Sequence, residues 1–375
     1  MITWIKTKYN KFEILFILLN YLNNMNILKD THANRIKVAS KIEDGEIVIL
    51  PSNGVYTFNT NIFNNQSIEK IYMLKERDID TPLGVAVKDI EMAKTLMDRN
   101  SMTDQEMLII ETLIAEFWPD MLSIIVKTHL TNPLFTANGY ISLQMPCYGA
   151  VKDIMNELGK PIVTTSANIN KKTSCTHINH VKNYFTEIDG ITALEASDTP
   201  KYGIENTIIK IDVDRLFILR PGIITKCQIE EVLYKKSLHC TVEYMDECEH
   251  GVADTHYGID KKCLLTNFVT SEMLDKSINK FSLKYLNKSI IVDFGKRNIE
   301  KKDLAAGYVD LSENGDINEG LFNLYDVLHQ LNNIDKNNIL FMDLYNNQNE
   351  LYKTMSDKLI HCCNNKRIMV PLYYS

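Results

Sequence analysis

The sequence predicts an α/β protein built from two units, each with its own sheet and flanking helices. The chain of 375 residues is long enough for two hydrophobic cores. Between residues 35 and 226, short apolar runs alternate with segments of helical spacing, which predicts a twisted mixed sheet. This rhythm is lost over residues 227–262 and then returns. We therefore expect a large unit at residues 31–226, a linker at residues 227–262 and a smaller α/β unit at residues 263–375.

The elements of the large unit follow from local pattern. Helices are expected where apolar residues recur every three or four positions, at residues 68–74 and 107–117. The second of these is expected to end at Trp118-Pro119, because proline disfavours helical backbone at the residue before it. Strands are expected where short apolar runs stop at turn residues. These runs are residues 46–50, 83–87, 122–126, 140–143, 162–165, 207–211 and 216–219.

The C-terminal unit shows the same alternation with fewer elements. Apolar runs predict strands at residues 289–292, 307–311 and 338–343. Helical spacing predicts helices at residues 320–331 and 350–362. Alternating strands and helices of this kind indicate a small Rossmann-like α/β unit.

Residues 1–30 are expected to form an N-terminal extension. Three lysines precede an apolar run at residues 12–22, as in a signal peptide, but Glu13 and Asn20 interrupt the run and no small-residue cleavage site follows. The run is too short to span a bilayer. A helical or disordered extension is favoured over a membrane anchor, and translation starting at Met25 is an alternative.

Composition narrows the class of protein. Hydrophobic residues make up 45% and charged residues 24% of the chain, as in ordinary globular proteins. The formal net charge of -7 argues against a broad basic surface for nucleic acid. It leaves room for a local basic pocket, which needs only a few cations.

The eight cysteines are scattered, and Cys362 and Cys363 are adjacent. Reduced thiols in a cytoplasmic protein fit this better than a disulfide framework. One group carries residue types that bind zinc but lacks a C-x-x-C pair, so ordinary linker residues are favoured and no metal site is expected. The group is His239, Cys240, Cys248, His250 and His256.

Polar residues follow the expected strand at residues 46–50. Ser52 and Tyr56 lie in this loop, and open α/β sheets bind ligands at the carboxyl ends of their strands. Taken alone, an ordinary loop explains the pattern equally well.

Two cations, Lys75 and Arg77, end the expected helix before Thr81-Pro82-Leu83. They suit the separate oxygens of a triphosphate. Without further context, hydrogen bonds to the last carbonyls of the helix are the simpler explanation.

A third polar run, Thr164-Thr165-Ser166-Ala167-Asn168, exits a predicted strand. Its hydroxyls and amide can bind a nucleotide without adding charge, and a helix N-cap is the alternative. Later, Gly203-x-Glu205-x-Thr207 precedes a strand, and Arg220-Pro221-Gly222 ends one. Arg220 is a natural anion ligand.

In their shared order these motifs resemble the Sua5/YrdC family of threonylcarbamoyl-AMP synthases. The resemblance covers about residues 35–226. Beyond it, His256-Tyr257 and residues 319–328 are similar to the linker and the C-terminal domain of the long, two-domain Sua5 form. The matching residues are Pro51, Tyr56, Lys75, Arg77, Pro82-Leu83, Trp118-Pro119, Thr165-Ser166-Ala167-Asn168, Ser174, Gly203, Glu205, Thr207 and Arg220-Pro221-Gly222.

The resemblance implies a YrdC-like sheet and a synthase that makes threonylcarbamoyl-adenylate and pyrophosphate from threonine, bicarbonate and ATP. Magnesium would arrive with ATP and be held largely by the nucleotide. The product would pass to the threonylcarbamoyl-transferase machinery that makes t6A in tRNA, with direct RNA contact as an option. A cytoplasmic protein without membrane contact is implied.

The resemblance also implies residue roles. Lys75 and Arg77 would be catalytic, through neutralisation of phosphate charge. The ATP-binding positions would be Arg77, Thr81, Ser166, Asn168, Ser174, Arg220 and Tyr257, the last closing over the site from the linker. The threonine-binding positions would be Ser52, Tyr56, Thr164 and Asn206.

Departures from the family pattern gather on the threonine side. Gly54 stands where the family has threonine, Ala86 where it has histidine and Gln144 where it has arginine. Ser123 and Asn206 also depart from it. An active synthase is therefore weighed against a degenerate nucleotide- or RNA-binding member without turnover. A structural or interaction protein of unrelated α/β fold is the third alternative.

Overall fold

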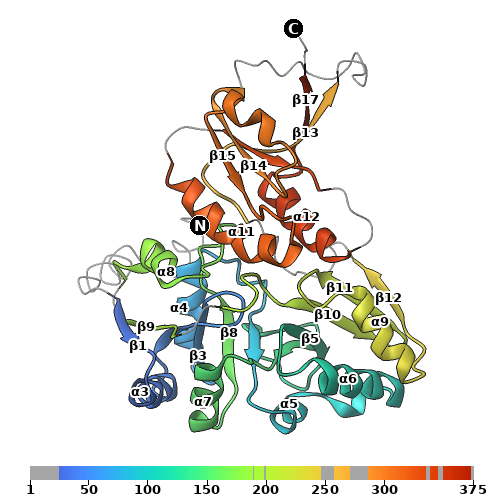
Figure 1. The fold of residues 1–375 in the computed structure, drawn as a ribbon. Helices are drawn as coiled ribbons and strands as arrows, with labels where there is room; N and C mark the ends of the chain where they lie inside the picture. The colour runs from blue at the N-terminus through green and yellow to red at the C-terminus, as the bar shows by residue number, and fades with distance from the viewer. Residues whose placement is uncertain are drawn as a thin grey trace.

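The computed structural model describes residues 25–188, 190–197, 200–245, 257–270, 286–334, 338–344 and 349–372. They form a large mixed sheet in residues 25–245, here the N-terminal part, and a small parallel sheet in residues 257–372, the C-terminal part. Figure 1 shows the C-terminal part seated on one side of the large sheet. The predicted α/β class, a twisted mixed sheet followed by a smaller α/β unit, is confirmed.

The large sheet has the strand order β1-β9-β2-β3-β8-β4-β7-β5-β10-β11-β12, with β6 paired to β7. Parallel and antiparallel pairs are mixed along it; β5 is antiparallel to β7 and parallel to β10. Its strands, in chain order, are β1 (Asn26–Lys29), β2 (Ile47–Leu50), β3 (Thr57–Asn61), β4 (Gly84–Ala86), β5 (Leu122–Lys127), β6 (Thr136–Ala137), β7 (Tyr140–Gln144), β8 (Ile162–Ser166), β9 (Ile191–Glu195), β10 (Thr207–Asp212), β11 (Arg215–Arg220) and β12 (Thr241–Tyr244).

Helices cover both faces of this sheet. The side chains of β2 alternate between the two faces and pack against both sets of helices. Ile47 and Ile49 join the cluster built with α4, α6, α8 and α9, whereas Val48 and Leu50 join the one built with α3 and α7. Successive strand side chains point to opposite faces, so all four are buried. The helices are α3 (His32–Glu43), α4 (Asn65–Lys75), α5 (Ile90–Leu96), the short η1 (Arg99–Ser101), α6 (Asp104–Phe117), α7 (Gly149–Leu158), α8 (Ile178–Phe185) and α9 (Lys226–Lys235).

Residues at the two ends of α6 determine where this helix begins and ends. Thr103 and Glu106 form a reciprocal capping box at its start, which satisfies backbone donors that have no partner within the helix. The helix ends at Phe117, and the Trp118-Pro119 peptide bond that follows is cis. The predicted end is therefore confirmed.

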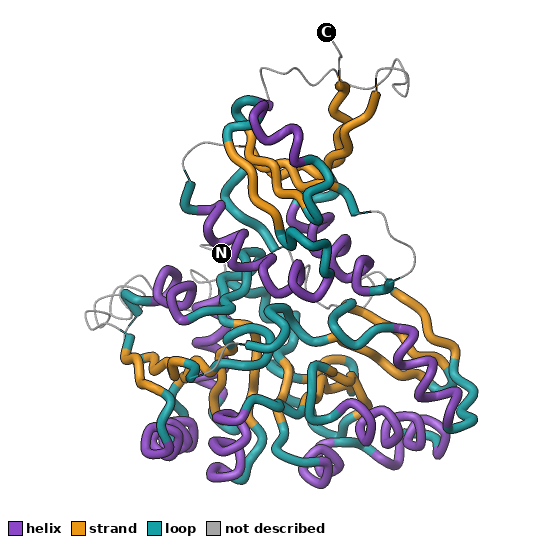
Figure 2. The backbone as a smooth tube through the Cα atoms, in the orientation of Figure 1, coloured by secondary structure: helices purple, strands orange, loops and turns teal. Residues whose placement is uncertain are grey.

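The C-terminal part has the all-parallel order β15-β14-β16-β13-β17. Helices α11 and α12 lie between its sheet and the N-terminal part, as Figure 2 shows. Its elements are β13 (Cys263–Thr270), β14 (Ser289–Asp293), the short η4 (Ile299–Leu304), β15 (Gly307–Asp310), α11 (Ile317–Asn332), β16 (Asn338–Met342), α12 (Leu351–Cys362) and β17 (Arg367–Leu372).

The structure contains elements that the sequence analysis did not predict, among them α3, α7, α8, β3, β9, β13 and β17. Most of α9 and all of β12 lie in the expected linker, and β1 lies in the expected N-terminal extension. Helix α9 has a capping box at Thr225 and buries Ile229 and Leu233, an i,i+4 pair that the surrounding charges obscured. The strands β1 and β12 lie at the two ends of the large sheet and pair with distant segments, so no local signal marks them. Of the described residues, no helix is long and apolar enough to cross a membrane.

Two histidines stack where the two parts meet. His180 on α8 and His329 on α11 have ring centroids 3.8 Å apart and an interplanar angle of 12°. The His180 Nε2 lies 3.1 Å from a carboxylate oxygen of Asp326, and the His329 Nε2 lies 3.0 Å from the Ser174 carbonyl oxygen. Burial lowers the pKa of His180 to about 4, helped by His329 and His177 and opposed by Asp326. Burial also lowers the pKa of His329.

This pair predicts loss of stability in mild acid. Both folded-state pKa values lie below the unfolded value of about 6.5, so the unfolded chain takes up protons first as the pH falls. The stability that the two neutral histidines contribute is fully present above pH 6.5 and is lost progressively as the pH falls toward about 4. We expect the melting temperature to fall by about 5 °C or more across this window. Scanning calorimetry of the His180→Gln/His329→Gln variant should show a flatter profile. The exposed His129→Gln control should keep the original one; equal profiles in all three proteins would contradict the prediction.

Candidate functional site

The main cavity of the N-terminal part has a volume of about 440 Å³. Its floor is the face of β10, β5 and β7, and its walls are the loops that follow β2 and α4 together with the C-terminal ends of β8 and β11. Six of the residues predicted to be catalytic or to bind ATP or threonine line this cavity. They are Ser52, Arg77, Thr164, Ser166, Asn206 and Arg220.

The end of α4 places Arg77 in this cavity. Glu76 adopts the left-handed conformation (φ 52°), which stops the helix and turns the chain back, and the Arg77 amide donates to the Tyr72 carbonyl. The guanidinium then donates to the Thr81 and Pro82 carbonyls at 3.1 and 3.2 Å. Arg77 therefore braces the next loop instead of satisfying the last carbonyls of its own helix.

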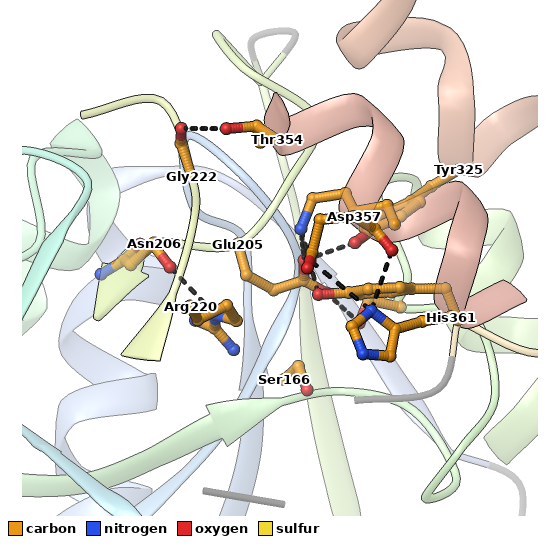
Figure 3. Close-up of polar contacts among 12 residues, drawn as sticks. Ser166, Glu205, Asn206, Arg220, Gly222, Tyr325, Thr354, Asp357 and His361 are labelled. Atoms are coloured by element: carbon orange, nitrogen blue, oxygen red, sulfur yellow. Dashed lines mark hydrogen bonds and ion pairs between the residues drawn. The ribbon is translucent and has the colours of Figure 1, made fainter. Parts of the chain in front are cut away.

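Arg220 enters the same cavity from the end of β11. Its Nε donates to the Asn206 carbonyl at 3.0 Å, as Figure 3 shows. Among the described residues, neither Arg77 nor Arg220 forms an ion pair. Burial lowers the pKa of Arg77, and the charge of Arg220 lowers it further. Two guanidinium groups that repel each other and lack a carboxylate partner create a site for an anion.

Lys75 is buried and holds the loop after β8. Its ammonium donates to the Ser166 carbonyl, and to the carbonyl and side-chain oxygens of Asn168 at 3.0 and 3.2 Å. The Ser166 hydroxyl donates to the same Asn168 oxygen at 2.6 Å. The next helix, α8, begins at Ile178 with His177 as its N-cap. Ser166 and Asn168 therefore form a loop tethered by Lys75 rather than a helix cap, and burial holds the pKa of Lys75 well below its ordinary value.

Beneath the cavity, Glu205 connects the two parts of the protein. Its carboxylate accepts from the Ser174 hydroxyl at 2.6 Å and from the Tyr325 hydroxyl of α11 at 2.5 Å. The Lys358 ammonium of α12 lies 3.6 Å from it. Burial by itself would raise the pKa of Glu205, but Lys358, Arg220 and the two hydroxyl donors outweigh burial and hold the pKa below its ordinary value. Figure 3 shows this buried group beside Arg220.

Tyr257 belongs to the same interface. Its hydroxyl accepts from Lys358 at 3.0 Å, and its ring stacks on Tyr325 with centroids 5.4 Å apart. It is 2% exposed and does not line the cavity. Its neighbour His256 lies outside the described residues.

Three positions that depart from the family pattern contact one another in the cavity floor. Ser123 on β5 lies opposite Gln144 on β7. The Asn206 amide donates to the Gln144 side-chain oxygen at 2.8 Å and to the Ser123 hydroxyl at 3.1 Å, and that hydroxyl donates to Gln144 at 3.0 Å. The departures form a matched, uncharged network.

The departure from the family pattern at Gly54 has a steric explanation. A Cβ atom there would lie 2.0 Å from the Ile204 carbonyl oxygen, so no side chain fits. Gly203, which precedes Ile204, has φ 69° and also lies close to α11, where a Cβ atom would be 2.6 Å from the Phe322 carbonyl oxygen. Ala86 is buried in the α3–α7 cluster and does not line the cavity.

Other predicted positions lie near the cavity without lining it. Tyr56 is in the core, where its hydroxyl accepts from the Ala196 amide at 3.0 Å. Thr81 contributes its backbone carbonyl to Arg77 and Tyr72. Lys75, Asn168, Ser174 and Tyr257 support the walls from behind.

Sequence reasoning missed Lys210, Tyr325 and Lys358. Lys210 lines the cavity on the same face of β10 as Ile208, and a charged residue at an alternating strand position was a usable signal. Tyr325 and Lys358 are helical residues that only the contact between the two parts brings to Glu205.

The described residues contain free cysteines and no cluster of metal-binding side chains. The seven cysteines among them are free, and no group of three or more histidine, cysteine or acidic side chains there could hold a metal. Of the zinc-like group considered above, Cys248, His250 and His256 lie outside the described residues.

Comparison with known proteins adds to this geometry. The Sua5/YciO/YrdC family model, described as "Telomere recombination", matches residues 40–222. A putative threonylcarbamoyl-AMP synthase of Methanocaldococcus jannaschii is 30% identical over 186 residues, which cover 49% of this chain and 83% of that protein. The chain belongs to the Sua5/YrdC family.

A second relative, the threonylcarbamoyl-AMP synthase of Bacillus subtilis, is 31% identical over 230 residues. The match spans 59% of this chain and 63% of that protein. Two structures of Pyrococcus abyssi Sua5, one of them complexed with L-threonine, have TM-scores of 0.74 and 0.73 to this chain at 18% and 20% identity. They cover 94% and 92% of it, so the two-part fold is that of Sua5.

The Glu205 network predicts a clear stability effect. Lys358→Met leaves a buried carboxylate without its nearby cation, and we expect the free energy of unfolding to fall by about 3 kcal/mol. Urea denaturation measures this directly. The Lys358→Met/Glu205→Gln variant removes both charges and should recover much of the loss. No loss in the single variant, or no recovery in the double variant, would contradict the prediction.

Proposed function

We propose that this chain is an L-threonylcarbamoyladenylate synthase, a nucleotidyltransferase that makes threonylcarbamoyl-AMP and pyrophosphate from threonine, bicarbonate and ATP. Its product would serve t6A modification of tRNA. The observation that carries the proposal is the pair Arg77 and Arg220, which share the main cavity without a carboxylate partner among the described residues. The names of the Bacillus and Methanocaldococcus relatives support the same activity.

The reaction makes modest chemical demands on the protein. Threonine's amine first adds to bicarbonate-derived CO₂ to give a carbamate, and a carbamate oxygen then attacks the α-phosphorus as pyrophosphate leaves. Such a transfer depends on positioning and charge neutralisation more than on a covalent nucleophile. Arg77 and Arg220 are preorganised for this, because backbone carbonyls already fix both guanidinium groups.

The other residues predicted to bind ATP are of two kinds: one lines the cavity, and the rest hold the loops around it in place. Ser166 lines the cavity, with its hydroxyl proton donated to Asn168, whereas the functional groups of Asn168 and Ser174 are engaged beneath the cavity. We assign Lys75 to positioning, since its ammonium is occupied by the loop that carries Ser166. Tyr257 and Thr81 would act in the same indirect way.

On the amino-acid side, Ser52, Thr164 and Asn206 line the cavity and would contact threonine. Tyr56 would hold the loop between β2 and β3 through Ala196.

Magnesium would enter with ATP. Mg²⁺ usually keeps several waters and takes one or two carboxylates together with substrate phosphates. Asp80 lines the cavity, and its carboxylate is committed to no ion pair within the part of the chain that the structure describes. These residues therefore fit a nucleotide-held ion, which would neutralise phosphate charge.

Removing either guanidinium should abolish turnover. Arg77→Met and Arg220→Met each delete one of the two cavity arginines, and we expect threonine- and bicarbonate-dependent pyrophosphate release to fall by about 100-fold or more. Arg99→Met is the matched control, because Arg99 is exposed and, among the described residues, its ion-pair partner is the exposed Asp104.

The unaltered chain provides the decisive test. Absence of pyrophosphate release from the purified protein with all three substrates would overturn the synthase assignment. Binding of ATP without turnover would instead support a degenerate member of the family.

A further inference from the structure

The cavity contains a third cation, separate from the arginine pair. Lys210 lies on β10 two residues beyond Ile208, which pairs with Arg220 on β11. From there it faces the opposite end of the floor, and its own partner on β11 is Phe217. Burial lowers the pKa of Lys210, and the charge that acts on it is Asp212 on the same strand, at more than ion-pair distance, rather than Arg77 or Arg220. The cavity therefore has two positive regions, one at the arginine pair and one at Lys210.

The surroundings of Lys210 suit one small anion. Its ammonium lies 4.1 Å from the centroid of the Tyr140 ring, which fixes the position of the charge without neutralising it. Ile125 is its direct neighbour on β5, and Ser142 is the next residue across, on β7. No carboxylate within the described ranges lies within ion-pair distance of Lys210, and the apolar floor strengthens any charge interaction there.

The three acidic residues that line the cavity, Asp80, Asp120 and Glu205, form no ion pair with Lys210 within the part of the chain that the structure describes. Glu205 is bound by Tyr325, Ser174 and Lys358. Asp120 accepts from the Tyr202 hydroxyl and lies near Lys201.

At the other end of the floor strands, next to Arg220 of β11, the floor side chains themselves carry no charge. Ser123, Gln144 and Asn206 satisfy one another, and Gln144 keeps its side-chain N–H groups free of any contact with the described residues. This network can donate to a neutral oxygen, but it cannot neutralise a carboxylate. A carboxylate bound on this floor therefore has its charge partner at Lys210.

We propose that Lys210 is the residue that binds the carboxylate of the amino-acid substrate. The inference rests on the proposed function, from which it takes the amino acid as ligand. Ser142 is placed to donate a hydrogen bond to the same carboxylate, and the arginine pair remains available for phosphates. The amino acid then lies along β10, β5 and β7, with its polar groups toward the neutral network.

The test compares ligands that differ only in the carboxylate. Calorimetric titration of the full chain, in the presence of a non-hydrolysable ATP analogue, would measure binding of L-threonine and of L-threonine amide. Lys210→Met should weaken binding of L-threonine by about 10- to 100-fold and leave binding of the amide nearly unchanged. Lys210→Arg keeps the charge and should retain most of the affinity. Lys152→Met, on the exposed surface of α7, is the control and should match the unaltered protein.

The outcomes separate this inference from the proposed function. An equal loss for threonine and its amide, a loss of affinity for the ATP analogue alone, or no threonine binding to the unaltered chain would overturn the role of Lys210. Carboxylate-dependent binding without pyrophosphate release would overturn the synthase assignment and leave Lys210 as the carboxylate site.

Discussion

The buried carboxylate of Glu205 is the interaction on which the arrangement of this molecule depends. A carboxylate in a protein interior is stable only where cations and hydrogen-bond donors replace its lost water. Here the N-terminal part supplies Ser174 and the C-terminal part supplies Tyr325 and Lys358. Neither part alone completes the set, so docking of α11 and α12 keeps the carboxylate ionised at the base of the cavity.

The same interface fixes the shape of the cavity wall. Gly203 and Gly54 let two stretches of backbone approach α11 and each other more closely than any side chain would allow. Val55 and Ile204, which flank these contacts, pack into the hydrophobic cluster of the C-terminal part. The loops around the cavity are thereby held by a second core, which provides the rigidity that charge-positioning chemistry requires.

Three positions that depart from the family pattern are linked by hydrogen bonds, which explains why these residue types occur together. Ser123, Gln144 and Asn206 lie far apart in the chain, yet they hydrogen-bond to one another on neighbouring strands. An amide, a hydroxyl and a second amide satisfy each other, whereas any one of them alone would leave unpaired polar groups. The three departures therefore form one uncharged network in the floor, and Lys210 is the cation on the strands that make up this floor.

The sequence by itself determined the class of fold, about half of the described helices and strands, and the residues, such as Arg77 and Arg220, that are proposed to bind an anion. Those features are local: β2 is a continuous apolar run, α6 has a capping box, and Arg77 follows directly on a helix end. Only the tertiary structure decided that β1 and β12 extend the large sheet, because their partners are distant in the chain. It also separated the residues that face the cavity, such as Arg77 and Lys210, from those that support it, such as Lys75 and Tyr257. Which way a polar side chain points depends on partners from other segments, and Glu205 finds two of its own in helices more than a hundred residues away.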